Sequence, residues 1–155
     1  MENINVRVRS RAPLDNLFAL AQTAYDFVDA MPNIKKIMVL EETEDRKRSK
    51  AEWILDVPIP GRFGKMAWIK EASWDDANHK CDIRLSPDYK GIVKKLDGTW
   101  KFTPCGDGTE MNMLMDFRVS HPLVSRRVHD IFVGIMKKNL ESLMLAIKRK
   151  AESSL

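Results

Sequence analysis

The chain has 155 residues, of which 44% are hydrophobic and 31% charged, and it carries a net charge of +4. This length suits one domain with its own core, and the composition excludes a disordered chain. The positive charges lie in separate short clusters, which argues against a nucleic-acid-binding protein. No apolar run approaches the ~20 residues that a membrane-spanning helix needs.

The two cysteines, Cys81 and Cys105, lack the spacing of a zinc site or of a disulfide framework. Met1–Arg11 already alternates between polar and apolar residues, so it does not resemble a secretory leader. We therefore expect one cytoplasmic domain over residues 1–155 with reduced thiols, no metal and no other cofactor. We expect no nucleic-acid partner and no stable membrane insertion, and the sequence leaves open a monomer or a homodimer.

The first part of the chain predicts a strand followed by helix. Apolar and polar residues alternate over Asn3–Arg9, which is typical of a half-buried strand. Pro13 suits the first turn of a helix, and apolar residues then recur at helical spacing as far as Val28. Because Met31–Asn33 ends this pattern, we expect one kinked helix or two short ones.

The middle of the chain has a period of two, which predicts consecutive strands of an antiparallel sheet. A charged hairpin tip is expected at Glu44–Arg48, and turns at Pro58–Gly61 and Pro104–Gly108. In the last turn, Gly106 and Gly108 are expected to need positive φ. The predicted strands are Ile34–Thr43, Ser49–Val57, Phe63–Trp74, Lys80–Leu85, Ile92–Phe102 and Met111–Val119.

From His121 to Glu152 the apolar residues recur with a period of 3.6, which predicts one long helix. Such a helix is roughly 40 Å long and must bury its apolar side against the sheet. The expected fold class is α+β. It has a curved antiparallel sheet of about six to seven strands around the long C-terminal helix, with two short helices after the first strand.

Three segments resemble a known family. The sharpest is DGTWKFTP at Asp97–Pro104, followed by GDGT at Gly106–Thr109; weaker ones are Trp68 with Glu71, and Asn33–Glu41. They are similar to the polyketide cyclase/dehydrase and coenzyme-Q-binding branch of the START/Bet v 1-like (SRPBCC) superfamily. The resemblance implies the helix-grip fold and a cavity for lipids, quinones or polyketides between helix and sheet.

The chain departs from the aromatase/cyclases at one strand. Those enzymes carry Trp-x-Ser-x-Arg there, and the resemblance gives the Ser and Arg a role in orienting and dehydrating a polyketide. Here Trp68 is kept, but Lys70 stands at the Ser position and Ala72 at the Arg position. This puts aromatase activity in doubt, although Lys70 supplies a cation.

Methionine and tryptophan dominate the predicted interior. Methionine adapts to irregular ligands, and tryptophan offers a flat surface with one donor. The structural alternative is that these residues only fill the core. The candidate ligand-binding residues are Trp53, Met66, Trp68, Trp100, Phe102, Met111, Met113, Met115, Phe132, Ile135 and Met136.

Two residues are candidates for chemistry. By alternation, Lys70 shares a face with Met66 and Trp68. If it points inward, it has a lowered pKa or a carboxylate partner, and it holds a carboxylate, phenolate or enolate. If the strand is irregular, it reaches solvent instead. Tyr25 is the second candidate, as a donor to a ligand carbonyl or as a core tyrosine with its hydroxyl at the rim.

Three functions follow from these features. The first is a carrier or chaperone that binds a small hydrophobic ligand in a biosynthetic pathway, and an all-apolar cavity favours it. The second is a polyketide aromatase/cyclase of the dehydratase type, favoured by an inward cation in a large cavity. The third is a partner- or membrane-docking module, favoured by a collapsed cavity with an exposed apolar patch.

Overall fold

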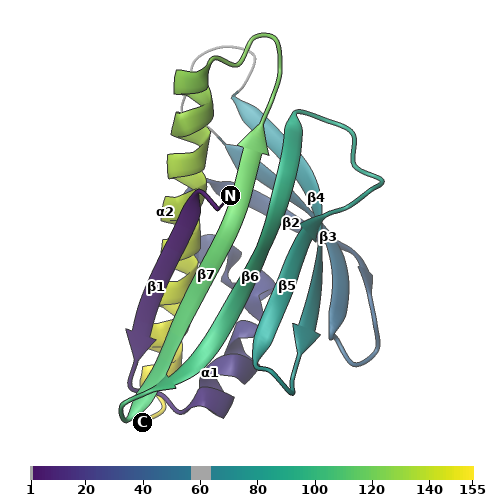
Figure 1. Ribbon diagram of the computed structural model, residues 1–155. Coiled ribbons are helices and arrows are strands. Elements are labelled where there is room, and N and C mark those ends of the chain that lie inside the picture. Colours follow the sequence, from purple (N-terminus) through teal and green to yellow (C-terminus); the bar gives the residue numbers. More distant parts are fainter. Residues whose placement is uncertain (1, 57–63) are drawn as a thin grey trace.

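The structure is a computed structural model that describes residues 2–56 and 64–155. Its seven strands form one antiparallel sheet in the order β1-β7-β6-β5-β4-β3-β2 (Figure 1). This confirms the predicted sheet and its meander of consecutive strands. The strands are β1 (Ile4–Ser10), β2 (Ile34–Glu42), β3 (Arg48–Asp56), β4 (Lys65–Asp75), β5 (Lys80–Leu85), β6 (Val93–Cys105) and β7 (Gly108–Val119).

The long helix α2 (Arg126–Glu152) lies across the concave side of the sheet, as predicted (Figure 1). It begins later than expected, because the Ser125 hydroxyl accepts a hydrogen bond from the Val128 amide and caps the helix there. Its apolar stripe contacts β1, β7 and the segments after β1. The buried residues of this stripe include Phe132, Met136, Leu140, Leu143, Met144 and Ile147.

Two short helical segments follow β1, which confirms that prediction. The first, α1, spans Leu14–Ala21, and the second, η1, is a 3₁₀ helix over Ala24–Ala30. Phe18 of α1 packs edge-on against Trp74 and Phe102, at centroid distances of 5.4 and 5.2 Å. Apolar burial of this ring fixes α1 over one end of the sheet.

The turn between β6 and β7 is tighter than predicted. β6 continues through Pro104 to Cys105, which pairs with Gly108, so that only two residues form the loop. Gly106 has φ +59°, but Gly108 has no positive φ. Gly108 is needed for another reason: a Cβ there would meet the Ser10 carbonyl oxygen at 2.0 Å. The predicted Pro58–Gly61 turn, and the first residue of the strand predicted at Phe63, lie outside the described residues.

A buried asparagine joins α2 to the sheet. Asn139 is fully buried, and its side-chain oxygen accepts a 2.9 Å hydrogen bond from the Asn33 amide. Its side-chain nitrogen donates to the Asn33 side chain at 3.0 Å and to the Ile135 carbonyl at 2.7 Å. Because these polar groups satisfy one another, they fix the helix against the start of β2.

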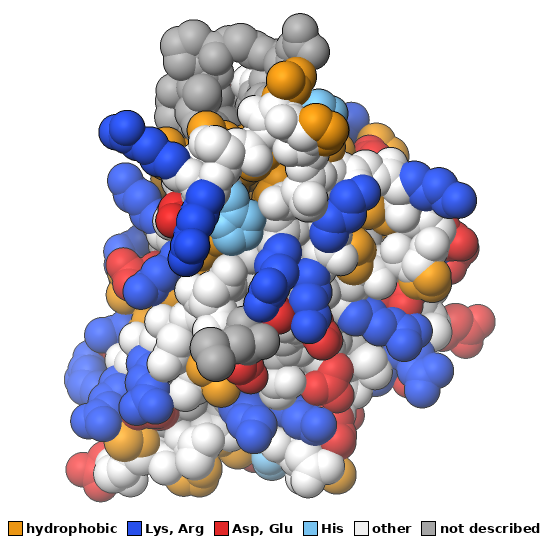
Figure 2. Space-filling view, turned by 45° about the horizontal axis from the view of Figure 1, so that its top comes forward, with side chains coloured by type: hydrophobic (Ala, Val, Ile, Leu, Met, Phe, Trp, Pro, Cys, Tyr) orange, Lys and Arg blue, Asp and Glu red, His pale blue; other side chains and the backbone are white. Residues whose placement is uncertain are grey.

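The outer surface is polar and charged. Figure 2 shows Lys and Arg side chains spread over one face, with Asp and Glu among them, and not gathered in one stripe. On the outer side of β7, Asp116 accepts from Arg118 at 3.0 Å and pairs with Lys95 at 3.1 Å. None of the helices in residues 2–56 and 64–155 is long and apolar enough to cross a membrane.

Candidate functional site

The concave face of the sheet carries all four tryptophans of the chain. Trp53 on β3 stands opposite Trp68 on β4, and their rings stack at 6.1 Å with an angle of 21°. Trp74 on β4 packs against Trp100 on β6 at 5.7 Å. Strand alternation places these side chains inward, where they form an aromatic wall that faces α2.

A cavity lies between this wall, α2 and the segment from α1 to η1. Its volume is about 40 Å³, which holds a few water molecules and is much smaller than a drug-sized pocket. The cavity is lined by Gln22, Ala24, Tyr25, Trp53, Trp68, Lys70, Ala72, Trp74, Cys81, Ile83, Leu96, Trp100, Met113, Met115, Met136, Leu140 and Leu143.

Two hydrogen-bond donors in the wall have no partner. The Nε1 atoms of Trp53 and Trp100 are buried and make no hydrogen bond, although both rings line the cavity. A buried donor without a partner costs about 1–3 kcal/mol, so native proteins rarely keep one without a use. Two residues that line the cavity therefore each keep an unused hydrogen-bond donor.

Lys70 points into the same space. Its ammonium lies 4.6 Å from the centre of the Trp53 ring and 5.5 Å from that of Tyr25. A carboxylate partner was expected for an inward lysine, but within the described residues Lys70 forms no ion pair. The electron-rich faces of the two rings stabilise the ammonium in place of a carboxylate. The N–H groups of the ammonium are therefore available to a ligand.

Tyr25 of η1 and Cys81 of β5 are further polar residues that line the cavity. The Tyr25 hydroxyl shares a 2.7 Å hydrogen bond with the Ser49 hydroxyl and is half-buried, so it is already partnered. Burial raises the pKa of the Cys81 thiol to about 12, and the nearby Lys70 ammonium offsets only part of that effect. The thiol is therefore protonated at neutral pH and is a weak nucleophile.

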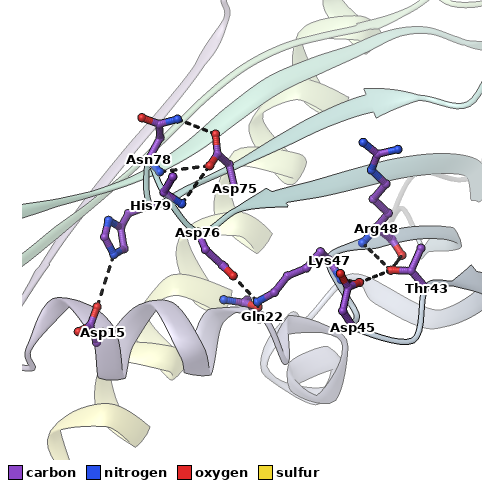
Figure 3. A network of polar contacts seen from close by, with 11 residues as sticks. Asp15, Gln22, Thr43, Asp45, Lys47, Arg48, Asp75, Asp76, Asn78 and His79 are labelled. Atoms are coloured by element: carbon purple, nitrogen blue, oxygen red, sulfur yellow. Dashed lines mark hydrogen bonds and ion pairs between the residues drawn. The ribbon is translucent and has the colours of Figure 1, made fainter.

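A polar network lies next to Gln22, one of the residues that line the cavity (Figure 3). Lys47, in the β2–β3 turn, donates to the side-chain oxygen of Gln22 at 2.6 Å and pairs with Asp76 at 3.0 Å. In the same β4–β5 turn as Asp76, His79 contacts Asp15 of α1 at 3.4 Å. These contacts tie α1 and the residue after it to two hairpin turns, and Gln22 is itself a lining residue.

The structure brings together most of the residues that the sequence singled out. Lys70, Tyr25, Trp53, Trp68, Trp100, Met113, Met115 and Met136 line the cavity. Phe102 does not, because Phe18 covers its ring. The other predicted ligand-binding residues that lie away from the cavity are Met66, Met111, Phe132 and Ile135. Of these, Met66, Met111 and Phe132 are buried in the core, and Ile135 is partly buried against it.

Sequence reasoning missed several lining residues, although most of them carried a signal. Ala72 and Trp74 continue the alternation of Lys70, and Cys81 and Ile83 alternate on β5. Leu140 and Leu143 lie on the apolar stripe of α2, and Leu96 faces inward on β6. Gln22 and Ala24 gave no signal, because only the fold places the end of α1 over the cavity.

The composition of the wall favours binding over acid–base catalysis. Among the described lining residues none is Asp, Glu or His, so the wall offers no obvious general base. In the same part of the chain no cluster of His, Cys, Asp and Glu is arranged to hold a metal ion. Three of its polar groups are donors without a hydrogen-bond acceptor, namely the Nε1 groups of Trp53 and Trp100 and the Lys70 ammonium, in aromatic and aliphatic surroundings.

Comparison with known proteins agrees with this geometry. A sequence model of the family described as "Polyketide cyclase / dehydrase and lipid transport" matches residues 1–152. No curated protein matches the chain in sequence.

Solved structures show the same fold. Protein TTHA0849 from Thermus thermophilus superimposes with a TM-score of 0.80 at 20% identity, over 97% of each chain. The Zhui aromatase/cyclase from Streptomyces sp. R1128 superimposes with a TM-score of 0.73 at 17% identity, over 96% of this chain and 92% of that one. A STAR-related lipid transfer protein from Xanthomonas axonopodis gives 0.70 at 18% identity, over 92% and 84%.

These likenesses are below 25% identity and establish the fold alone, whereas the family match covers nearly the whole chain. The expected helix-grip architecture is confirmed by the seven-stranded sheet around α2. The chain belongs to the family described as polyketide cyclase/dehydrase and lipid transport.

Proposed function

We propose that the protein binds a small, largely apolar ligand with an acidic or carbonyl oxygen, in the cavity between the sheet and α2. In this role it carries or shields an intermediate of a biosynthetic pathway. The observation that carries the proposal is the set of donors without partners: Trp53 Nε1, Trp100 Nε1 and the Lys70 ammonium. Each is satisfied by an oxygen acceptor that enters the cavity.

The ligand class follows from the wall. Aromatic and methionine side chains provide flat or adaptable apolar contacts for a ring system or an isoprenoid chain. A carboxylate, phenolate, enolate or quinone oxygen supplies the lone pairs that the donors lack. A polyketide, a quinone and a fatty acid share this chemistry.

The small cavity means that binding must widen it. Met113, Met115 and Met136 are unbranched side chains that change rotamer at low cost. The η1 segment is a 3₁₀ helix with a kink at Phe27, and it covers the cavity through Ala24 and Tyr25. Ligand entry therefore moves η1 and the methionines, while the tryptophans of the sheet stay in place.

A second candidate is a polyketide aromatase/cyclase. Lys70 and Tyr25 both line the cavity, and the Lys70 ammonium lies 5.5 Å from the centre of the Tyr25 ring. Aromatase/cyclases are also among the proteins of similar fold. Lys70 then polarises a ligand carbonyl and stabilises the enolate that forms. Binding without conversion of a poly-β-keto substrate separates the carrier from the enzyme.

A docking module without a ligand is less well supported. The small cavity and the exposed apolar residues Met38–Leu40 favour it. A core that only fills space, however, has no use for two indole N–H groups and a cation that make no hydrogen bond. The cytoplasmic location stays a prediction from the sequence.

Native mass spectrometry of the protein purified from its own host tests the proposal. The expected result is a near-stoichiometric bound molecule with at least one acidic or carbonyl oxygen. A protein that is always empty, and that gains no thermal stability from a panel of aromatic acids, quinones and fatty acids, contradicts it.

A further inference from the structure

The strand β2 lies at one end of the sheet, and within residues 2–56 and 64–155 it pairs with β3 alone. Its outer edge therefore exposes unpaired backbone groups, which is a template for a further strand. Met38, Val39 and Leu40 are 40%, 43% and 45% exposed, and these three consecutive residues are half of the large exposed apolar side chains in the described part of the chain.

The opposite edge does not share this character. On β1 the apolar residues alternate with exposed polar ones, and the apolar set is buried under α2. A run of exposed apolar residues is thus confined to the β2 edge. Lysine on an edge strand is a common protection against unwanted pairing, but in β2 the lysines are matched by acids at the other end.

The charges of β2 are ordered along the strand. It begins with Lys35 and Lys36 and ends with Glu41 and Glu42, with the apolar segment Ile37–Leu40 between them. An antiparallel copy of the same strand reverses this order. The two lysines of each copy then lie beside the two glutamates of the other, whereas parallel pairing would place like charges together.

Symmetry restricts the register. A two-fold axis between antiparallel strands is perpendicular to the sheet, and it pairs residues that point to the same face. The bulge between Val39 and Glu41 shifts the alternation, so that Lys36 and Glu41 lie on the same outer face, opposite Ile54 and Lys50 of β3. A two-fold axis beside the apolar segment then brings Lys36 of each copy near Glu41 of the other. This arrangement forms two Lys–Glu pairs related by symmetry.

In the monomer, the Asp56 carboxylate offsets only part of the positive charge beside the cationic end of β2. Lys35 lies next to Lys65 of β4, and this neighbouring ammonium lowers the pKa of Lys65 from its usual value. Among the described residues, Lys35, Lys36 and Glu41 form no ion pair. A glutamate from a second copy relieves the repulsion between the two lysines.

We propose that two copies of this chain associate through antiparallel pairing of their β2 strands, which joins the two sheets into one. The pairing is short, because β2 has irregular register with β3 between Ile34 and Lys36 and again between Val39 and Glu41. An interface of this size buries less than a standard one, so the dimer is reversible and depends on protein concentration. This inference is independent of the ligand in the cavity.

Charge-swap variants test it by sedimentation velocity between micromolar and millimolar protein. K35E/K36E makes β2 acidic at both ends, and E41K/E42K makes it basic at both ends. Each variant alone is expected to dimerise at least about tenfold more weakly than the wild type, because like charges then meet across the interface. An equimolar mixture restores dimerisation to within about threefold of the wild type, because each end again meets its opposite charge.

The matched control is K137E/K138E, which makes the same change of charge on the exposed side of α2 and leaves the dimer unchanged. Circular dichroism verifies that each variant folds. If a double variant is unfolded, the single pair Lys36→Glu and Glu41→Lys replaces it in the same mixing experiment. A wild type that stays monomeric at all concentrations overturns the proposal. The proposal is also overturned if both charge variants dimerise as strongly as the wild type, or if their equimolar mixture does not recover dimerisation.

Discussion

The ammonium of Lys70 lies 4.6 Å from the centre of the Trp53 ring, and the N–H of that same indole is buried without a hydrogen-bond partner. The cation is held by the face of the ring, while the ring's own donor has no acceptor. Two groups of positive character thus meet in one apolar cavity. We propose that a ligand oxygen satisfies both groups.

Replacing Lys70 by Met is expected to weaken selectively the binding of an acidic ligand. Affinity for 2-naphthoate falls at least about tenfold, or about 1.4 kcal/mol, because a charge-assisted hydrogen bond is lost. Affinity for 2-naphthamide, which has the same ring system and no charge, changes much less. Isothermal titration calorimetry measures both. Lys70→Arg is the control that keeps the charge, and an equal loss for the two ligands in Lys70→Met would count against the assigned role.

Asp116 is expected to make stability depend on acid pH. Its burial raises the pKa of the carboxyl, but hydrogen bonds from Arg118 and Lys95 outweigh this and lower the pKa to about 2. The stabilisation is therefore present above about pH 4 and is lost as pH falls towards 2, and it amounts to at most about 2 kcal/mol. Urea unfolding of the wild type and of Asp116→Asn between pH 7 and pH 2 measures the difference. Identical pH dependence in the two proteins would contradict it.

Asn139 is expected to be necessary for docking α2. Asn139→Leu removes the acceptor of the part-buried backbone N–H of Asn33, and the free energy of unfolding falls by about 1–3 kcal/mol. A double-mutant cycle with Asn33→Ala isolates the contact between the two side chains. The two losses should add to more than the loss in the double variant. Strict additivity would show that the pair is not coupled.

The two glycines of the β6–β7 hairpin are expected to respond differently to alanine. Gly108→Ala places a Cβ 2.0 Å from the Ser10 carbonyl oxygen, so the strands must separate and stability falls by several kcal/mol, on the order of an overpacked core. In Gly106→Ala the added Cβ has no atom within 4 Å. Stability then falls by about 1 kcal/mol, because alanine disfavours a positive φ. Chemical denaturation compares the two variants. A larger loss for Gly106→Ala would contradict this assignment.

Alternation and helical period were sufficient to predict most of the fold. β5 was predicted with both its ends, and α2 with its apolar stripe, because side chains on one face of each element are buried together. The predicted end of β6 at Phe102 was wrong, because the strand continues through Pro104 to a loop of only two residues. The irregular register of β2 was also not predictable, since it depends on how the edge follows the curved sheet.

The candidate site was predictable only in part. Lys70 and the three tryptophans at 53, 68 and 100 follow from alternation within a strand. Which residues of one face reach the cavity depends on what covers them. Met111 shares a face with Met113, yet only Met113 lines the space, and Phe102 is covered by Phe18 of a distant segment. Such long-range cover has no local signal in a sequence.

The central claim is that a ligand oxygen in the cavity engages the unpaired donors of its lining, beginning with the Trp53 Nε1 group beside Lys70. The most direct measurement is the indole N–H region of a ¹⁵N–¹H correlation spectrum, recorded while 2-naphthoate is added, with each tryptophan assigned by substitution with Phe. We expect the Nε1 proton of Trp53 to move downfield, as protons do on forming a hydrogen bond, and the movement to shrink in Lys70→Met, because the Lys70 ammonium lies over the Trp53 ring. Indole signals that stay unchanged while the ligand binds elsewhere, or that no acidic ligand moves, would contradict the account.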